Sequence, residues 1–134
     1  MLISRSLTYA AVLLGGSVAQ AQTYTPTHVA HTLPGWQCMS LASVYGPQGT
    51  YAPPVPVFFG PQPDAPQVGT GAGVIIVPMP LHPINGRTEM IWPNGQRVWI
   101  AANLLAPWHS LSDLNASCHP ALLSNGRYGF TTNE

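Results

Sequence analysis

The stretch Thr88–Ile100, TEMIWPNGQRVWI, decides the fold of this chain. Two short runs with β-forming residues flank Pro93-Asn94-Gly95, which is the pattern of a β-hairpin. Proline cannot take the positive φ that the first central residue of a type I′ turn requires. Pro93-Asn94 is therefore expected to form a type I turn, with Gly95 left-handed in a bulge. A turn of this kind fixes which residues of the two strands lie opposite each other.

The two tryptophans of this hairpin are predicted to lie on opposite faces. The expected register places Trp92 opposite Gln96, and side chains alternate between the faces along each strand. One face then carries Met90, Trp92, Val98 and Ile100, and the other carries Glu89, Ile91, Arg97 and Trp99. We expect the first face to enter the core, so Trp92 packs inward and Trp99 is the ring available to a ligand.

Residues 1–21 have the pattern of a secretory signal peptide. Arg5 precedes an apolar run from Leu7 to Val18, and Ala19-Gln20-Ala21 is an Ala-x-Ala cleavage site. The run is shorter than the roughly twenty apolar residues that cross a bilayer. We expect cleavage before Gln22, no membrane insertion of the mature chain, and export to a periplasm or out of the cell.

The composition limits what the mature chain can be. Its length of about 113 residues suits one small domain with a modest core. The whole chain has four arginines, no lysine and four acidic residues, whereas nucleic-acid binding needs many cations to neutralise phosphates. Nucleic-acid binding and attraction to a membrane surface are therefore excluded. A hydrophobic fraction of 46% is too high for a chain that is disordered throughout.

Proline and glycine point to an all-β fold. Fifteen prolines and thirteen glycines argue against long helices, because an interior proline removes a hydrogen bond and clashes with the preceding turn. Short apolar runs separated by turn residues between Val55 and Leu105 are typical of a small antiparallel barrel or sandwich. Trp36–Leu41 fits either a short strand or a helical turn.

The only two cysteines, Cys38 and Cys118, are predicted to form a disulfide, because an exported protein matures in an oxidising compartment. Closing a loop of about 80 residues removes unfolded-chain entropy worth roughly 4 kcal/mol in the loop-closure model. A reactive thiol is the competing interpretation of either cysteine.

Four segments between Val55 and Leu105 resemble the bacterial SH3-type domain, a five-stranded barrel common in exported cell-envelope proteins. In order, they are VPVFFGP at 55–61 against the family's LNVRSGPS, APQVGT at 65–70 against xPVIGT, residues 85–95 against NGWYKVRLSDG, and residues 97–105 against TGWVSSSYL. The resemblance implies a small five-stranded SH3-like barrel over residues 55–107, with an N-terminal extension at 22–54 and a C-terminal extension at 108–134. Trp99 is the aromatic residue that matches the family's motif.

The aromatic residues suggest a recognition site. Trp99, with Phe58, Phe59 and Tyr51, is the predicted ligand-binding set, since flat amphipathic rings bury area at a low entropy cost. The expected ligand is a peptide, peptidoglycan or a protein partner of the cell envelope. The competing expectation is that the two extensions, joined by the disulfide, cover the Trp99 face.

Metal binding and catalysis are weaker interpretations. His28, His31 and His82 with Met79 offer imidazole and thioether, which suit copper, but their spacing is not diagnostic without a helix. We expect scattered surface histidines and no metal or other cofactor.

A cysteine hydrolase that pairs a thiol with a histidine would need roughly a hundred further residues. Four acidic residues make a catalytic carboxylate pair improbable. We therefore expect a non-catalytic recognition module, with a purely structural or stress-protective envelope protein as the alternative and a cysteine hydrolase as the third possibility.

Overall fold

The computed structural model describes residues 26–42, 54–110 and 112–133. Almost all of the regular structure in these residues is β-strand, which confirms the all-β prediction. The elements are β1 (Val29–Thr32), β2 (Trp36–Leu41), β3 (Val55–Phe58), β4 (Gln67–Gly71), β5 (Val74–Pro78), β6 (Arg87–Ile91), β7 (Arg97–Ala101), the 3-10 helix η1 (Ala102–Leu104), β8 (Leu105–Pro107), β9 (Ser117–Leu123) and β10 (Tyr128–Asn133).

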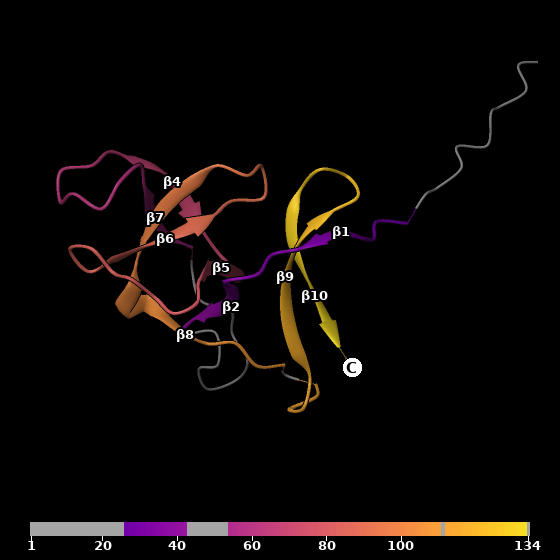
Figure 1. Cartoon of the computed structure of the whole chain (residues 1–134). Helices are drawn as coiled ribbons and strands as arrows, with labels where there is room; N and C mark the ends of the chain where they lie inside the picture. The colour runs from indigo at the N-terminus through magenta and orange to yellow at the C-terminus, as the bar shows by residue number, and fades with distance from the viewer. Residues whose placement is uncertain (1–25, 43–53, 111, 134) are drawn as a thin grey trace, which may run out of the picture.

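The strands form two antiparallel sheets that lie side by side (Figure 1). The larger sheet has the order β4-β3-β7-β6-β5-β2-β8, and the smaller has the order β1-β9-β10. Consecutive strands β5, β6 and β7 form a meander. After β7, η1 turns the chain so that β8 pairs with β2, where Ser40 lies opposite Ala106.

The larger sheet has seven strands where five were expected. Six of these strands, β3 to β8, begin within residues 55–107, and β2 precedes them. The outer strands β4 and β8 do not pair with each other in the described residues, so the sheet is open and the five-stranded barrel is not confirmed. Trp36–Leu41 is therefore a strand, and it is held on both sides because it pairs with β5 and β8. Its pairing with distant strands satisfies backbone groups that a short isolated strand would leave open.

The predicted hairpin is confirmed. Met90 lies opposite Val98 and Glu89 lies opposite Trp99. The Trp92 N–H donates to the Gln96 carbonyl at 2.9 Å, and the Gly95 N–H donates to the Trp92 carbonyl at 2.8 Å. Gly95 has a φ of 86°, as the predicted bulge requires.

The core lies on the inner face of the larger sheet, which we define as the face that carries Met90 and Val98. Seven buried residues form one cluster there: Leu41, Val57, Ile75, Val77, Met90, Val98 and Ile100. Trp92 packs against this cluster but remains only partly buried. The prediction that the first face of the hairpin enters the core is therefore confirmed.

The outer face of the larger sheet is partly covered by the smaller sheet. Cys38, Ile76 and Ile91 are neighbours across β2, β5 and β6, and all three are buried. Cys38 forms a disulfide with Cys118 of β9, with an S–S distance of 2.08 Å, which confirms the predicted pairing. The two sheets are thus linked covalently at their contact, with β9 and β10 alongside the larger sheet (Figure 1).

Two hairpins with the same turn chemistry meet where the sheets adjoin. In the β6–β7 hairpin the Asn94 side chain accepts a hydrogen bond from the Gln96 N–H at 2.9 Å. In the β9–β10 hairpin the Asn125 side chain accepts one from the Arg127 N–H at 3.0 Å. The glycine after each asparagine has positive φ. Such Asn-Gly sequences favour short β-turns.

Candidate functional site

An apolar pocket lies between the two sheets, beside the tip of the β6–β7 hairpin. It has a volume of about 160 Å³. Its walls come from β4, β5, the β6–β7 hairpin and β10. The lining residues are Thr70, Gly71, Ala72, Val74, Ile75, Ile76, Met90, Ile91, Trp92, Pro93, Tyr128, Gly129 and Phe130. The rings of Trp92, Tyr128 and Phe130 give this pocket an aromatic wall.

Two glycines allow these rings to approach the backbone. A β-carbon at Gly69 would lie 2.9 Å from Cη2 of Trp92, and one at Gly95 would lie 2.9 Å from Cε2 of Tyr128. Both distances are too short for a real side chain, so a larger residue would displace the ring. Gly69 therefore sets the position of Trp92 against β4, and Gly95 sets the position of Tyr128 against the hairpin tip.

The pocket opens toward a shallow polar hollow. Thr70, Trp92 and Pro93 border both spaces, and the hollow adds Asn94 and Arg127. Arg127 is exposed. The ion pair observed within the described residues joins Arg97 to Glu89, so Arg127 lines this hollow beside the pocket without an ion-pair partner among those residues.

The structure brings two of the predicted ligand-binding residues together on the outer face. Phe58 and Trp99 are paired across β3 and β7. The guanidinium carbon of Arg87 lies 3.5 Å from the centroid of the Phe58 ring, a cation–π contact. Arg87 also donates to the carbonyls of Gly60 at 3.2 Å and Gln62 at 2.7 Å. One face of the Phe58 ring is therefore already covered by a side chain that is held in place.

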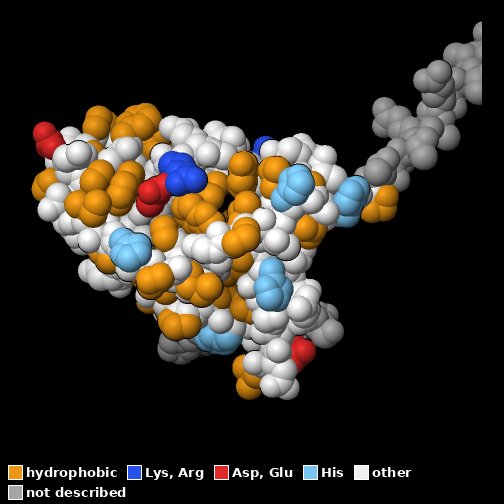
Figure 2. Space-filling view, viewed as in Figure 1, with side chains coloured by type: hydrophobic (Ala, Val, Ile, Leu, Met, Phe, Trp, Pro, Cys, Tyr) orange, Lys and Arg blue, Asp and Glu red, His pale blue; other side chains and the backbone are white. Residues whose placement is uncertain are grey.

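Trp99 is half-buried beside an ion pair. Glu89, its cross-strand neighbour, accepts a hydrogen bond from Arg97 at 2.8 Å. Arg97 also lies over the ring of Trp36, 4.9 Å from its centroid. Figure 2 shows adjacent cationic and acidic side chains surrounded by hydrophobic ones on this part of the surface. Trp99 thus lies in a patch whose charged groups already satisfy one another.

The other two predicted ligand-binding residues, Phe59 and Tyr51, do not extend this aromatic patch in the described structure. Phe59 is 54% exposed, and its N–H donates to the Pro66 carbonyl at the end of β3. Tyr51 lies outside the described residues. The smaller sheet buries Ile91 on the same outer face but leaves the Arg97 side chain 61% exposed. The smaller sheet therefore covers part of the outer face that carries Trp99, not all of it.

Histidines are spread singly over the surface in Figure 2. In residues 26–42, 54–110 and 112–133, no three His, Cys, Asp or Glu side chains gather in a way that could hold a metal ion. His28, His31 and His82 are exposed, as is Met79. Neither cysteine is free, since both belong to the disulfide.

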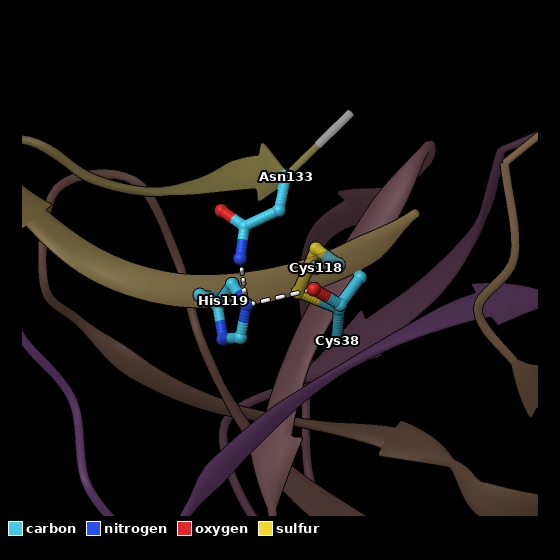
Figure 3. The surroundings of a disulfide bond; sticks show 5 residues. Cys38, Cys118, His119 and Asn133 are labelled. Carbon is cyan, nitrogen blue, oxygen red and sulfur yellow. Dashed lines mark hydrogen bonds between the residues drawn. A yellow bond between two sulfur atoms is a disulfide. The ribbon is translucent and has the colours of Figure 1, made fainter. Parts of the chain in front are cut away.

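A serine, a histidine and an asparagine lie together next to the disulfide (Figure 3). Ser117 Oγ is 2.9 Å from His119 Nε2, and Asn133 Nδ2 is 3.2 Å from the same nitrogen. A nucleophile–base–orienter arrangement requires the serine and the orienting group to bind different ring nitrogens. Here both contacts converge on Nε2, so the cluster does not have that geometry.

Sequence reasoning missed Tyr128, Phe130 and Arg127 as site residues. The segment SNGRYGF at 124–130 has the pattern of a turn followed by a short aromatic strand. What it could not indicate was the contact with the other hairpin, where the Tyr128 N–H donates to the Pro93 carbonyl at 2.8 Å. This contact assembles the pocket from residues far apart in the sequence.

Comparison with protein-family models, curated proteins and solved structures finds no match to this chain. In the part of the chain that the structure describes, no helix has the length and apolar character needed to span a membrane.

Proposed function

We propose that the protein is an exported, non-catalytic recognition module that binds a peptide, peptidoglycan or a protein partner in the cell envelope. The observation that carries this proposal is the apolar pocket bounded by Trp92, Tyr128 and Phe130, which opens to the surface. Concave, mostly apolar sites with a few polar groups at the edge are typical of ligand binding. Arg127, Asn94 and Thr70 supply such an edge.

The size of the pocket limits what it can take. An engineered cavity of about 150 Å³ accommodates a benzene molecule. The pocket here is of similar volume, about 160 Å³, so it suits one aromatic or branched aliphatic side chain. A partner would therefore insert a single apolar group, with its remaining contacts made on the rim.

The fold that presents the pocket is proposed to be an SH3-like barrel with an added sheet. Support comes from the meander β5–β6–β7, from the 3-10 turn η1 between β7 and β8, and from the pairing of β8 with β2. The hairpin β3–β4 lies in the long connection from β2 to β5. The disulfide is consistent with maturation in an oxidising, exported environment.

A purely structural role is the second candidate, and one feature favours it. The rings of Phe58 and Trp36 are already in contact with Arg87 and Arg97, so part of the aromatic surface is occupied from within the chain. Under this alternative, the pocket between the sheets would be a packing defect with no ligand.

Retention of the purified mature protein on purified peptidoglycan, and on beads that carry envelope proteins, tests the proposal. Phe130→Ala removes an exposed ring from the pocket and should reduce retention about tenfold, as for a central aromatic contact. Phe59→Ala removes another exposed ring, one that does not line the pocket, and it should leave retention unchanged.

Trp99→Ala distinguishes the pocket from the aromatic patch of Trp99 and Phe58 on the outer face of the larger sheet. If retention depends on Trp99 and not on Phe130, recognition occurs at the outer patch rather than at the pocket. Absence of retention of the wild-type protein on both supports would favour the structural role. Each variant should first show a wild-type denaturation midpoint, so that unfolding does not imitate a lost contact.

A further inference from the structure

The edge of β10 that faces the pocket carries open backbone groups. The Tyr128 N–H donates to Pro93, so it points away from β9 even though Tyr128 lies opposite Leu122 of β9. Hydrogen-bonded and non-hydrogen-bonded pairs alternate along an antiparallel ladder. The N–H and C=O groups of Phe130 and Thr132 must therefore also point away from β9.

The residue opposite Phe130 also indicates that the backbone groups of Phe130 are not paired with β9. Phe130 lies opposite Pro120, which has no N–H to donate. The carbonyl of Pro120 accepts a hydrogen bond from the Leu33 N–H at 3.2 Å, on the opposite side of β9. Pro120 thus offers β10 no hydrogen bond, and Phe130 has no backbone partner among residues 26–42, 54–110 and 112–133.

Arg127, Tyr128, Phe130 and Thr132 follow one another along the chain, from the turn before β10 into β10 itself. Phe130 borders the pocket, and Tyr128 separates it from Arg127 at the mouth. An antiparallel strand added to β10 would run from Thr132 toward Tyr128. Pairing would stop there, because Pro93 already occupies the Tyr128 N–H. The carboxyl end of the added strand would then meet the tip of the β6–β7 hairpin, beside the hollow that Asn94 and Arg127 line.

We propose that this edge binds the carboxyl-terminal end of an extended peptide, which pairs with Phe130 and Thr132, inserts one apolar side chain into the pocket and places its terminal carboxylate at Arg127. The inference rests on the proposed recognition function and specifies its ligand. Strand addition to an open edge supplies main-chain hydrogen bonds, and a side-chain pocket supplies selectivity. The single positive charge at the mouth favours a carboxylate over a neutral chain end.

Alternative occupants fit the observations less well. A strand that continued past Tyr128 would meet the hairpin tip, so an internal segment of a long partner is disfavoured. A second copy of this chain could pair β10 with β10. Such an arrangement would make binding depend on protein concentration, and sedimentation of the free protein separates it from peptide binding.

The experiment measures binding of the purified mature protein to an array of synthetic hexapeptides with a free carboxyl terminus and with Leu, Ile, Phe or Trp among the last three residues. The best binder is then compared with its carboxyl-terminal amide and with a version that has N-methylated backbone amides. We expect about fivefold weaker binding of the amide, the size of an exposed charge-assisted contact. N-methylation should weaken binding at least tenfold.

Variants of the protein test the same contacts from the other side. Arg127→Gln should abolish the preference for the free carboxylate over the amide, while Arg127→Lys should retain it. Thr132→Pro removes one N–H from the open edge without touching the β9 ladder, since edge positions tolerate proline. It should weaken binding about tenfold, whereas Thr132→Ala, which keeps the N–H, should not.

The outcomes separate this inference from the proposed function. Tight binding that is insensitive to amidation, N-methylation and Thr132→Pro overturns strand addition while recognition stands. Retention on envelope material that depends on Trp99, with no peptide bound, also overturns the inference alone. Self-association that Thr132→Pro abolishes assigns the edge to a second copy and overturns it. No retention and no peptide binding overturn both.

Discussion

Gly95 meets two independent requirements at one residue. Its φ of 86° is in the left-handed region that L residues with a β-carbon adopt at a cost. A β-carbon at this position would also lie 2.9 Å from Cε2 of Tyr128. The same glycine therefore shapes the turn of the β6–β7 hairpin and makes room for one aromatic wall of the pocket.

We expect Gly95→Ala to lower the free energy of unfolding by about 2 kcal/mol, because backbone strain and a displaced ring both contribute. Gly126→Ala is the matched control: Gly126 has a φ of 81° in the equivalent turn, but nothing lies within 4 Å of its β-carbon position. Gly126→Ala should lower the free energy of unfolding by about 1 kcal/mol, from backbone strain alone. Urea denaturation measures both, and equal losses would contradict a role for the Tyr128 contact.

At the scale of the elements, the link between β2 and β9 is what holds the small sheet on the large one. Three residues of the outer face, Cys38, Ile76 and Ile91, lie buried at this contact. The disulfide spans 80 residues of sequence. A small sheet needs a hydrophobic face to be stable, and β1, β9 and β10 are expected to depend on this contact for theirs.

Replacing both cysteines by serine should lower the free energy of unfolding by roughly 4 kcal/mol in the loop-closure model. Amide hydrogen exchange should accelerate more in β9 and β10 than in β6 and β7, because the meander keeps its own core. Chemical reduction of the wild-type protein should reproduce both effects. A loss below about 1 kcal/mol would contradict a major role of the disulfide in stability.

Local pattern was enough to predict some elements and not others. The β6–β7 hairpin was predicted with its register because its turn and its alternation lie within thirteen residues, Thr88–Ile100. The pairing of β2 with β5 and β8 was not predicted, because packing, rather than local sequence pattern, determines which strands distant in sequence pair with each other. Trp36–Leu41 consequently stayed ambiguous between a strand and a helical turn, and its place inside the larger sheet was not predicted.

The pocket was beyond sequence reasoning for the same reason. Trp92 belongs to the hairpin of the larger sheet and Tyr128 to the smaller sheet, and contacts of Tyr128 with Pro93 and Gly95 bring the two rings to one pocket. The sequence drew attention to Trp99 because it matched a family motif. In the structure Trp99 lies beside Phe58 and the Glu89–Arg97 ion pair, while the open hollow is next to the other tryptophan of the hairpin.

For the whole molecule, export remains a prediction from the sequence. The mature protein recovered after secretion should have an intact mass that corresponds to a chain beginning at Gln22. Ala21→Arg should prevent cleavage, because the residue before the cut must be small, and the unprocessed chain should stay with the membrane fraction. A full-length wild-type protein in the exported fraction would contradict the prediction.

The bond between Cys38 and Cys118 also determines how the protein would respond to mechanical tension. A force applied at the two ends of the chain is transmitted to β2 and β9 and then between them through the disulfide bond. Strands β3 to β8 lie between those two cysteines in sequence, so they carry none of the extension. If the protein joins two components of an envelope under turgor, its larger sheet would keep its shape while the ends outside the crosslink lengthen.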